Sequence, residues 1–406
     1  MRVLGRVRGR ALVARAIGRL GRAMIAIVLG LLSLVLPPHD EAIVSAILRW
    51  RQTPQQAVVH SHTVGDQHCG LRLTKVAAAA FASIGSKSQA EAAVKRGSLL
   101  VNGESVEKSR IVRVGDQLCF EPPAAPELSP AQLAARARFV AHLQLQGLRA
   151  VHEDDDVAVV YKPPGIHTKS GTNAKYAALE DGLPAILTPP STAPDPLPQP
   201  LVMHRLDVPV AGLCVVAKTR AAALDLANQF EARLISKVYH ALVVGQPAEG
   251  TALVTAPVGG LAAESSVEVL RVTPHPQWGA LSTLRLRPHT GRTHQLRVHA
   301  AGLGTPIVGD DLYWPAAAQA RASRGDEEPL PPLRKSGGLF LQSCAVSLER
   351  PRGQGTLTVM VAEAAKYGAL RERARSGAHY SAIRGADDVE SSEARPSSAI
   401  GAADAK

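Results

Sequence analysis

Apolar residues spaced three or four positions apart predict helices, and apolar residues that alternate with polar ones predict strands. The helical pattern occurs at 41–52, 73–82, 89–97 and 129–148. The last of these segments has Ser129 as a helix N-cap and Pro130 at the first helical position. Between 98 and 120, short apolar runs instead alternate with the turn pairs Asn102-Gly103 and Gly115-Asp116, which predicts small hairpins.

After residue 150 the pattern changes to apolar strands that each adjoin a short polar signature. These stretches are 153–168, 204–219, 236–245 and 284–314. Two polar or proline-rich segments, 183–200 and 314–338, interrupt the pattern and predict loops. The residues from 370 onward have almost no apolar periodicity, and such a composition predicts a disordered tail.

The composition fits two globular domains with appendages, since the chain has 406 residues and 46% of them are hydrophobic. A net charge of +11 favours a polyanionic partner. Seven arginines fall in the acid-free first 39 residues, and subtracting them leaves +4 for the remainder. Aromatic residues make up only 3%, so nucleic-acid binding would depend on charge and shape more than on base stacking. The four cysteines show no CxxC spacing, which argues against a zinc knuckle or a redox pair.

Residues 1–39 have the pattern of a targeting segment. An arginine-rich start leads into an apolar run of 14 residues, which is too short for an ordinary membrane span. The start is typical of a mitochondrial or plastid transit peptide, and the whole segment also fits a secretory-type leader. We predict a mitochondrion or plastid as the location, with cytoplasm or nucleus as the alternative. The mature chain is expected to be a monomer without stable membrane association.

The segment 68–121 resembles the S-four-type (alpha-L) RNA-binding domain. The resemblance lies in "LTKV" (73–76), "SKSQA" (86–90), "GSLLVNGESV" (97–106) and "VRVGD" (112–116). It implies that this module binds RNA, and the candidate contacts are Lys75, Lys87, Lys95 and Arg96. The alternative is a generic small α/β module whose lysines are merely solvated. The Arg-Leu-Asp-like start usual in the family is replaced here by "LRLTKVA".

The stretches after residue 150 resemble, in order and content, a pseudouridine synthase of the RluA type. They are "EDDDVAVVYKPPGIHT", "HRLDVPVAGLCVVAKT", "SKVYHALVVG" and "TGRTHQLRVH" followed by "GTPIVGDDLY". The last is the most specific because it is long. The resemblance covers roughly residues 150–365 and implies an α+β fold with a mixed, mainly antiparallel sheet. It also implies the isomerisation of uridine in RNA to pseudouridine, which uses neither a cofactor nor a metal.

This reaction requires an ionised carboxylate against the ribose of an extruded nucleotide, and burial alone would protonate such a group. A fixed cation must therefore keep it charged, and arginine suits this role. By resemblance, Asp207 is the catalytic carboxylate, Arg297 is its ionic partner, and Tyr239 is the active-site tyrosine that stacks on the target base. The alternatives are a turn carboxylate for Asp207 and a core residue for Tyr239.

Further residues of these stretches are candidate RNA contacts. In an extended chain Arg205 and Asp207 project to the same side. The resemblance implies that Arg205 enters the space left by the extruded base or grips phosphate, and a surface salt bridge is the alternative. Lys162 in "YKPPG" marks a phosphate-facing or structural turn. Arg292 and His294 are the remaining candidate RNA contacts.

The segment "HQLRVH", read as a strand, places Gln295, Arg297 and His299 on one face. Histidines 289, 294 and 299 are five residues apart. This spacing puts neighbours on opposite faces of a strand, and about 140° apart on a helix, so it fits no simple metal site. We expect no metal.

One departure from the family pattern bears on function. The family commonly follows "HRLD" with two variable residues and Thr-Ser-Gly or a near relative, whereas this chain has "VPVAG". Val210 and Ala211 lack hydroxyls that could brace the loop of the aspartate, and Gly212 keeps the turn. A non-catalytic RNA-binding or ribosome-assembly protein on the same scaffold therefore stays open. A glycosidase would need a second catalytic carboxylate, and the "EDDD" run at 153–156 is typical of a solvated turn.

The predicted order is a targeting segment (1–39), a linker with a short helix (40–67), the S-four-like RNA-binding domain (68–121), a linker helix (122–149), the pseudouridine synthase domain (150–369) and a disordered tail (370–406). The expected partner is RNA, and ribosomal, transfer and messenger RNA all remain open as targets.

Overall fold

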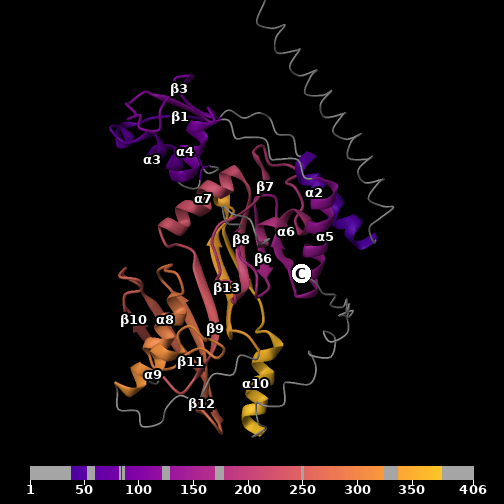
Figure 1. The fold of residues 1–406 in the computed structure, drawn as a ribbon, viewed down its shortest axis with the longest axis vertical. Coiled ribbons are helices and arrows are strands. Elements are labelled where there is room, and N and C mark those ends of the chain that lie inside the picture. The colour runs from indigo at the N-terminus through magenta and orange to yellow at the C-terminus, as the bar shows by residue number, and fades with distance from the viewer. Residues whose placement is uncertain are drawn as a thin grey trace, which may run out of the picture. The chain divides into compact units, whose positions relative to one another are not determined.

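The computed structural model of the chain describes residues 38–52, 60–81, 84, 87–120, 129–169, 178–247, 251–323 and 337–376. Of the predicted targeting segment (1–39), residues 1–37 lie outside these ranges, and so do residues 377–406 of the predicted tail (370–406). The chain divides into two compact units, Met1–Lys237 with Ser343–Val361 and Val238–Gln342 with Ala362–Lys406. Within the first unit, residues 60–120 have a sheet and a core of their own and are called the small module below (Figure 1).

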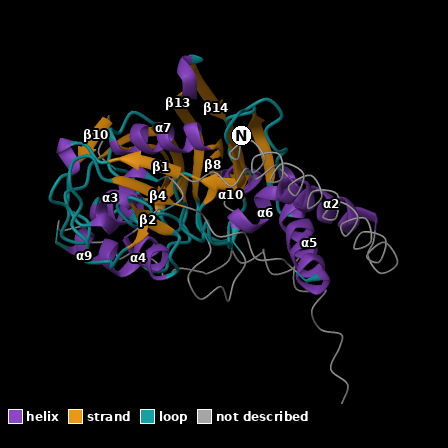
Figure 2. Ribbon diagram, turned by 90° about the horizontal axis from the view of Figure 1, so that it is seen from above, coloured by secondary structure: helices purple, strands orange, loops and turns teal. Residues whose placement is uncertain are grey.

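The small module contains an antiparallel sheet with the strand order β1-β4-β2-β3. Its strands are β1 (His60–Thr63), β2 (Leu99–Val101), β3 (Glu104–Ser105) and β4 (Gln117–Phe120). The 3-10 helix η1 (Asp66–His68) precedes the paired helices α3 (Leu73–Ala80) and α4 (Lys87–Lys95), which Figure 2 shows beside the sheet. The predicted helices and the Asn102-Gly103 turn are confirmed, whereas β1 lies in a stretch that the pattern assigned to a linker.

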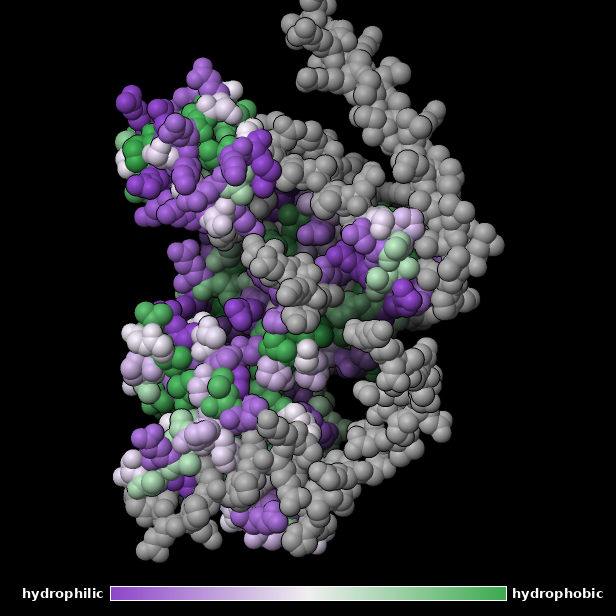
Figure 3. Space-filling model, viewed as in Figure 1, coloured by the Kyte–Doolittle hydropathy of each residue, from purple (hydrophilic) through white to green (hydrophobic). Residues whose placement is uncertain are grey.

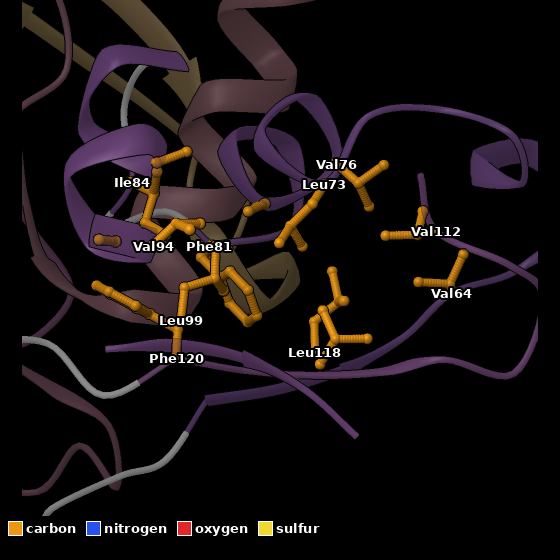
Figure 4. Packing of buried hydrophobic residues seen from close by; sticks show 14 residues of the cluster. Val64, Leu73, Val76, Phe81, Ile84, Val94, Leu99, Val112, Leu118 and Phe120 are labelled. Atoms are coloured by element: carbon orange, nitrogen blue, oxygen red, sulfur yellow. The ribbon is translucent and has the colours of Figure 1, made fainter. Parts of the chain in front are cut away.

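Helix and strand side chains of the small module meet in one apolar core (Figure 4). Leu73 and Val76 come from α3, Val94 from α4, and Leu99 and Leu118 from the sheet. All of them are at least nine-tenths buried. The periodic apolar positions of the two helices therefore form the faces that pack on the strands.

Three helices of the first unit pack against one another: α2 (Pro38–Gln52), α5 (Pro130–Leu145) and α6 (Leu179–Ile186) (Figure 2). The predicted N-cap of α5 is confirmed as a capping box. The Ser129 hydroxyl accepts the N–H of Gln132, whose side chain accepts the N–H of Ser129. The buried Trp50 donates its indole N–H to the carbonyl oxygen of Leu187 (2.8 Å), which ties the end of α2 to the segment after α6.

The main sheet of the first unit contains β5 (Arg149–Glu153), β6 (Val157–Lys162), β8 (Ala211–Thr219) and β13 (Leu341–Glu349), in the order β13-β8-β6-β5. In addition, β7 (Pro196–Val202) pairs with β8, and β14 (Thr356–Met360) pairs with β13. Helix α7 (Arg220–Glu231) packs its Ala222 and Leu226 against this sheet, and the 3-10 helix η2 (Pro351–Gly353) lies between β13 and β14. Nearly every residue of β6 and β8 is buried, which explains their continuous apolar runs.

The second unit contains β9 (Ser236–Val244), β10 (Thr251–Val254), β11 (Ser265–His275) and β12 (Gly279–Pro288). Their order is β10-β11-β12-β9, and all three pairings are antiparallel. The helices of this unit are α8 (Gln295–Gly302), α9 (Trp314–Ala322) and α10 (Ala365–Ser376). The two units together confirm the predicted α+β class with mainly antiparallel pairing. No helix in the described part of the chain is long and apolar enough to cross a membrane.

The segment "HQLRVH", which the sequence analysis considered as an extended strand, instead begins helix α8. On a helix Gln295 and His299 share a face, and Arg297 projects elsewhere. The Gln295 side chain explains where the helix starts, since its Oε1 accepts hydrogen bonds from the Thr290 hydroxyl (2.6 Å) and the Arg292 N–H (3.0 Å). The alternation of Leu296 and Val298 was too short to distinguish a strand from a helix.

Four further expectations change. The predicted loop 183–200 includes the end of α6 and most of β7, and the predicted loop 314–338 begins with α9. Helix α10 continues to Ser376, seven residues beyond the expected domain end. The "EDDD" run does form a turn, yet Asp156 is 6% exposed and accepts a hydrogen bond from the Thr219 hydroxyl (2.7 Å), so this carboxylate is structural and not solvated.

Candidate active site

Asp207 lies in the segment between β7 and β8, which has no regular strand or helix from Met203 to Val210. The Asp207 side chain is half-buried, Arg205 is exposed, and Leu206 between them is buried. A hydrogen bond from the N–H of Val210 to the carbonyl oxygen of Asp207 (3.0 Å) closes a turn directly after the aspartate. The carboxylate is therefore presented from a tight loop that joins two buried strands.

Lys162 ends β6 and has no exposed surface. Its ammonium group donates to the carbonyl oxygens of Pro163 (3.0 Å), Ile166 (2.9 Å) and Val208 (3.3 Å). Burial lowers the pKa of this group to about 8, and the negative charge of Asp207 acts in the opposite direction. Of the two roles considered for Lys162, these contacts favour the structural turn, and contact with RNA stays a prediction.

His204 was not singled out from the sequence, although it opens the "HRLD" signature. Its Nε2 accepts the backbone N–H of Val215 in β8 (3.0 Å), and its ring lies 5.3 Å from that of Phe230 in α7. Burial, and then the charge of Lys237, lowers its pKa to about 3. His204 is therefore a neutral hydrogen-bond acceptor that attaches the start of the Asp207 loop to the sheet.

Tyr239 belongs to the second unit, where it lies in β9 opposite Leu286 of β12. The residue is 8% exposed. This position is compatible with a core tyrosine and with an aromatic ring beside a bound base, so its role stays a prediction.

Arg297 is held in α8 by a carboxylate that the sequence analysis did not identify as its partner. Its Nε and Nη2 donate to the two carboxylate oxygens of Asp310, at 2.7 and 2.6 Å. Both side chains are buried. The guanidinium also lies over the ring of Tyr313, 5.1 Å from the ring centre, and the N–H of Tyr313 donates to Asp310 (3.3 Å). The orientation of the guanidinium is thus fixed by two parallel bonds and an aromatic ring.

The other two candidates of this region lie at the N-terminus of α8. Arg292 is half-exposed and donates its Nε–H to the carbonyl oxygen of Ala262 (3.0 Å). His294 adopts a left-handed backbone conformation, with φ 58°, and its Nδ1 forms a hydrogen bond with the hydroxyl of Tyr313 (3.0 Å). His294 therefore extends the Arg297–Asp310–Tyr313 cluster, and contact of either residue with RNA stays a prediction.

The basic candidates of the small module are all exposed: Lys75 on α3, Lys87 and Lys95 on α4, and Arg96 directly after α4. Hydrophilic side chains cover most of the visible face of this module (Figure 3). Lys87 makes a loose ion pair with Glu91 at 4.0 Å. These positive charges are available to a polyanion.

The three histidines considered for a metal have separate partners. His289 bonds to the Ser266 hydroxyl (2.7 Å), His294 to Tyr313, and the Nε2 of His299 to the carbonyl oxygen of Ala256 (2.9 Å). Within the described ranges no group of three or more His, Cys, Asp or Glu residues is arranged to hold a metal ion.

Comparison with known proteins places the chain among RNA-modifying enzymes. A family model described as RNA pseudouridylate synthase matches residues 156–302. Ribosomal large subunit pseudouridine synthase D of Vibrio parahaemolyticus is 32% identical over 296 residues, which are 68% of this chain and 82% of the relative. The protein of the same name from Pseudomonas aeruginosa is 32% identical over 60% of this chain and 74% of the relative. Among solved structures, human RNA Pseudouridylate Synthase Domain Containing 4 matches 59% of this chain and 97% of that chain, with a TM-score of 0.44 and 20% identity.

The family model and the bacterial relatives define an RNA pseudouridine synthase, and the chain belongs to the RluA-type family of these enzymes. It is an isomerase that converts uridines in RNA to pseudouridine.

Proposed function

We propose that Asp207 is the carboxylate that acts on the ribose of the target uridine. The observation that carries this proposal is the loop itself. It presents a half-buried carboxylate from a tight turn, with the ammonium group of Lys162 close enough to interact electrostatically with it.

Arg297 and Tyr239 complete the proposed catalytic set, as the family resemblance implies. The resemblance assigns Arg297 as the ionic partner of Asp207, and two bonds to Asp310 orient its guanidinium. Tyr239 would stack on the extruded base. The exposed Arg205, two residues before the aspartate, would occupy the gap in the RNA stack or grip a phosphate.

The proposed substrate is ribosomal RNA of the large subunit. The two bacterial relatives named above are ribosomal large subunit pseudouridine synthases, and they match most of their own length to this chain. The small module would add affinity through its exposed lysines and Arg96, which contact the RNA backbone without reading its sequence. Selection of the uridine would then rest with the catalytic domain.

Tritium release from RNA labelled at uridine C5 tests the catalytic assignment, because forming the new carbon–carbon bond at C5 displaces that hydrogen. The full chain should release tritium from large-subunit ribosomal RNA that lacks pseudouridine. Asp207→Asn should lower the rate by at least about 1,000-fold, as expected when a group that acts on the reacting atoms is removed. Asp225→Asn is the matched control, because Asp225 lies on α7 and accepts a hydrogen bond from Gln229, so this variant should keep the wild-type rate.

The alternative function is RNA binding without catalysis, and the "VPVAG" sequence after Asp207 is the observation that favours it. It predicts that wild-type protein binds the same RNA in a salt-sensitive manner and releases no tritium. If the wild type and Asp207→Asn both release tritium, the enzyme is active and only the proposed role of Asp207 is rejected.

A further inference from the structure

The backbone on both sides of Asp207 is held by residues from one neighbouring segment, 162–168. Before the aspartate, the Thr168 hydroxyl donates to the carbonyl oxygen of Leu206 (2.8 Å) and accepts the N–H of Leu206 (3.0 Å). After the aspartate, the carbonyl oxygen of Val208 accepts the N–H of Gly165 (2.8 Å) as well as the Lys162 ammonium. Rotation of either peptide group would break these bonds, so the direction in which the Asp207 side chain leaves the chain is fixed.

Thr168 is the one side chain that satisfies both backbone groups of Leu206 in these contacts. Thr168 is 3% exposed and Leu206 is 5% exposed, so water has little access to these groups. A buried N–H or carbonyl that loses its partner destabilises the conformation that buries it. Without the Thr168 hydroxyl, the Leu206 peptide groups would therefore favour a shifted loop in which they find other partners.

Thr168 is itself anchored to a helix. The N–H groups of Leu179 and Glu180, in the first turn of α6, donate to the carbonyl oxygens of His167 (2.8 Å) and Thr168 (3.3 Å). The carboxylate of Asp181 accepts the N–H of Ala178 (2.8 Å), which closes this end of the helix.

The same carboxylate of Asp181 pairs with Arg136 of α5. The backbone that carries the Thr168 hydroxyl is thus attached to α6, which is itself paired with α5.

The Thr168 hydroxyl braces the loop that contains Asp207, and the two residues at 210 and 211 in this loop have no hydroxyl. Val210 and Ala211 follow the aspartate, and neither can donate or accept a side-chain hydrogen bond. We propose that Thr168 is a positioning residue for Asp207, and that its hydroxyl supplies from the segment after β6 the bracing that residues 210 and 211 do not. This inference rests on the proposed role of Asp207 as the catalytic carboxylate.

Thr168→Val tests the inference, because valine keeps the shape of threonine and removes its hydroxyl. The turnover number kcat for tritium release should fall by about 10- to 100-fold, since a displacement of about 1 Å in a catalytic group has effects of this size. KM and the affinity for RNA should stay within about 2-fold of wild type, because surface contacts with the RNA are untouched. Thr168→Ser, which keeps the hydroxyl, should restore most of kcat.

Thr219→Val is a closely matched control within the same unit. The Thr219 hydroxyl also donates one bond, to Asp156 (2.7 Å), and accepts one, from the N–H of Ala222 (3.3 Å). Thr219 is fully buried as well, but none of these partners belongs to the Asp207 loop. The two valine variants should lose similar stability in urea unfolding, and only Thr168→Val should lose a large part of kcat.

Equal kcat values for the two valine variants would overturn the inference, and so would a Thr168→Ser variant as slow as Thr168→Val. If Thr168→Val melts below the assay temperature, Thr168→Cys replaces it, because a thiol is a weak hydrogen-bond donor and acceptor. A Cys variant as fast as the Ser variant would then overturn the inference. Failure of the proposed function is distinguishable, since Asp207→Asn would in that case remain active.

Discussion

Arg297 and Asp310 form a buried ion pair whose side chains are 6% and 1% exposed. Removing one partner of such a pair leaves an uncompensated charge away from water, so the loss exceeds the net contribution of the intact pair. Tyr313 connects the pair to His294 through its ring, its N–H and its hydroxyl. At the scale of single residues, the orientation of Arg297 therefore depends on Asp310 more than on any other contact described for it.

Asp310→Asn should destabilise the protein by about 3–5 kcal/mol, because the guanidinium of Arg297 stays buried without a negative partner. It should also slow tritium release, since the guanidinium loses the two bonds that orient it. Urea unfolding gives the stability, and single-turnover kinetics at saturating RNA give the rate of the chemical step.

Glu268→Gln is the control for this prediction. Glu268 also receives two bonds from one arginine, Arg285, at 2.9 and 2.8 Å, but both side chains are about one-third exposed. Water screens the exposed pair, so its loss should have a much smaller effect on stability and none on the rate. Comparable losses in the two variants would contradict the importance assigned to burial of the Arg297–Asp310 pair.

Secondary-structure elements whose capping residues or apolar periodicity lie within the element itself were predictable from sequence. The capping residues of α5, and the apolar periodicity of α3 and α4, are set by neighbours in the chain. Helix α8 was missed because six residues of alternating polarity fit a strand, while its helical start depends on Gln295 bonding back to Thr290. Strand β7 was missed because a proline-rich sequence reads as a loop, and its pairing with β8 is tertiary.

In the candidate site, too, the sequence indicated residues that lie in local motifs but not the tertiary contacts that support them. The sequence motifs identified Asp207, Arg297 and Tyr239 as residues to consider, since each lies in a recognisable signature. They could not identify the supporting contacts, because Thr168 lies 38 residues from Leu206 and Asp310 lies 13 residues from Arg297. Lys162 was named for RNA contact because a lysine beside two prolines resembles a surface turn, whereas its complete burial follows from the packing of β6 and β8.

Gly212 shows how one residue sets the approach of two elements. A Cβ atom on Gly212 would lie closer than 3.0 Å to backbone atoms of Ser343, at the start of β13, and the glycine has φ +122°. Both the space and the backbone conformation exclude a side chain. Gly212 therefore serves the contact between β8 and β13, in addition to the turn for which the sequence suggested it.

Helix α10 is attached to the sheet of the second unit by Glu363, which precedes it. The two carboxylate oxygens of Glu363 bond to His240 of β9 (3.1 Å) and to Arg371 of α10 (2.7 Å). Arg371 also donates to Thr283 of β12 (3.4 Å). The bond with His240, then that with Arg371, lowers the pKa of Glu363 to about 2 from its ordinary value of 4.5, against the opposing effect of burial.

This lowered pKa predicts how the attachment of α10 depends on pH. Because the folded state favours the ionised form, the stabilisation is complete above pH 4.5 and is lost as the pH falls toward about 2. Glu363→Gln should increase hydrogen exchange of the α10 amides at pH 7, and the difference from wild type should disappear near pH 2. Glu372→Gln, an exposed change on the same helix, should match wild type throughout. A difference between Glu363→Gln and wild type that does not change with pH would contradict the role of ionisation.

For the whole molecule, the distribution of charge indicates how RNA is held. Without residues 1–39 the net charge is only mildly positive, so non-specific affinity must come from local clusters. The small module provides one such cluster on α3, on α4 and directly after it, above an apolar core that does not depend on these side chains. Lys75, Lys95 and Arg96 can thus be replaced together without disturbing the fold of the module.

Replacing these three residues by alanine should weaken RNA binding and reduce its dependence on salt. Each phosphate contact contributes about 0.7 to the slope of log affinity against log salt concentration for single strands and about 0.9 for duplexes, so the slope should become shallower by about 2 to 3. Binding of labelled large-subunit RNA between low and physiological salt measures this slope. The matched triple variant replaces Arg271, Arg373 and Arg375, three exposed arginines of the second unit. If both triple variants change the slope equally, the RNA responds to total charge and the small module has no special role in binding. If only the first does, and kcat at saturating RNA is unchanged, the module supplies affinity while the catalytic domain retains the chemistry.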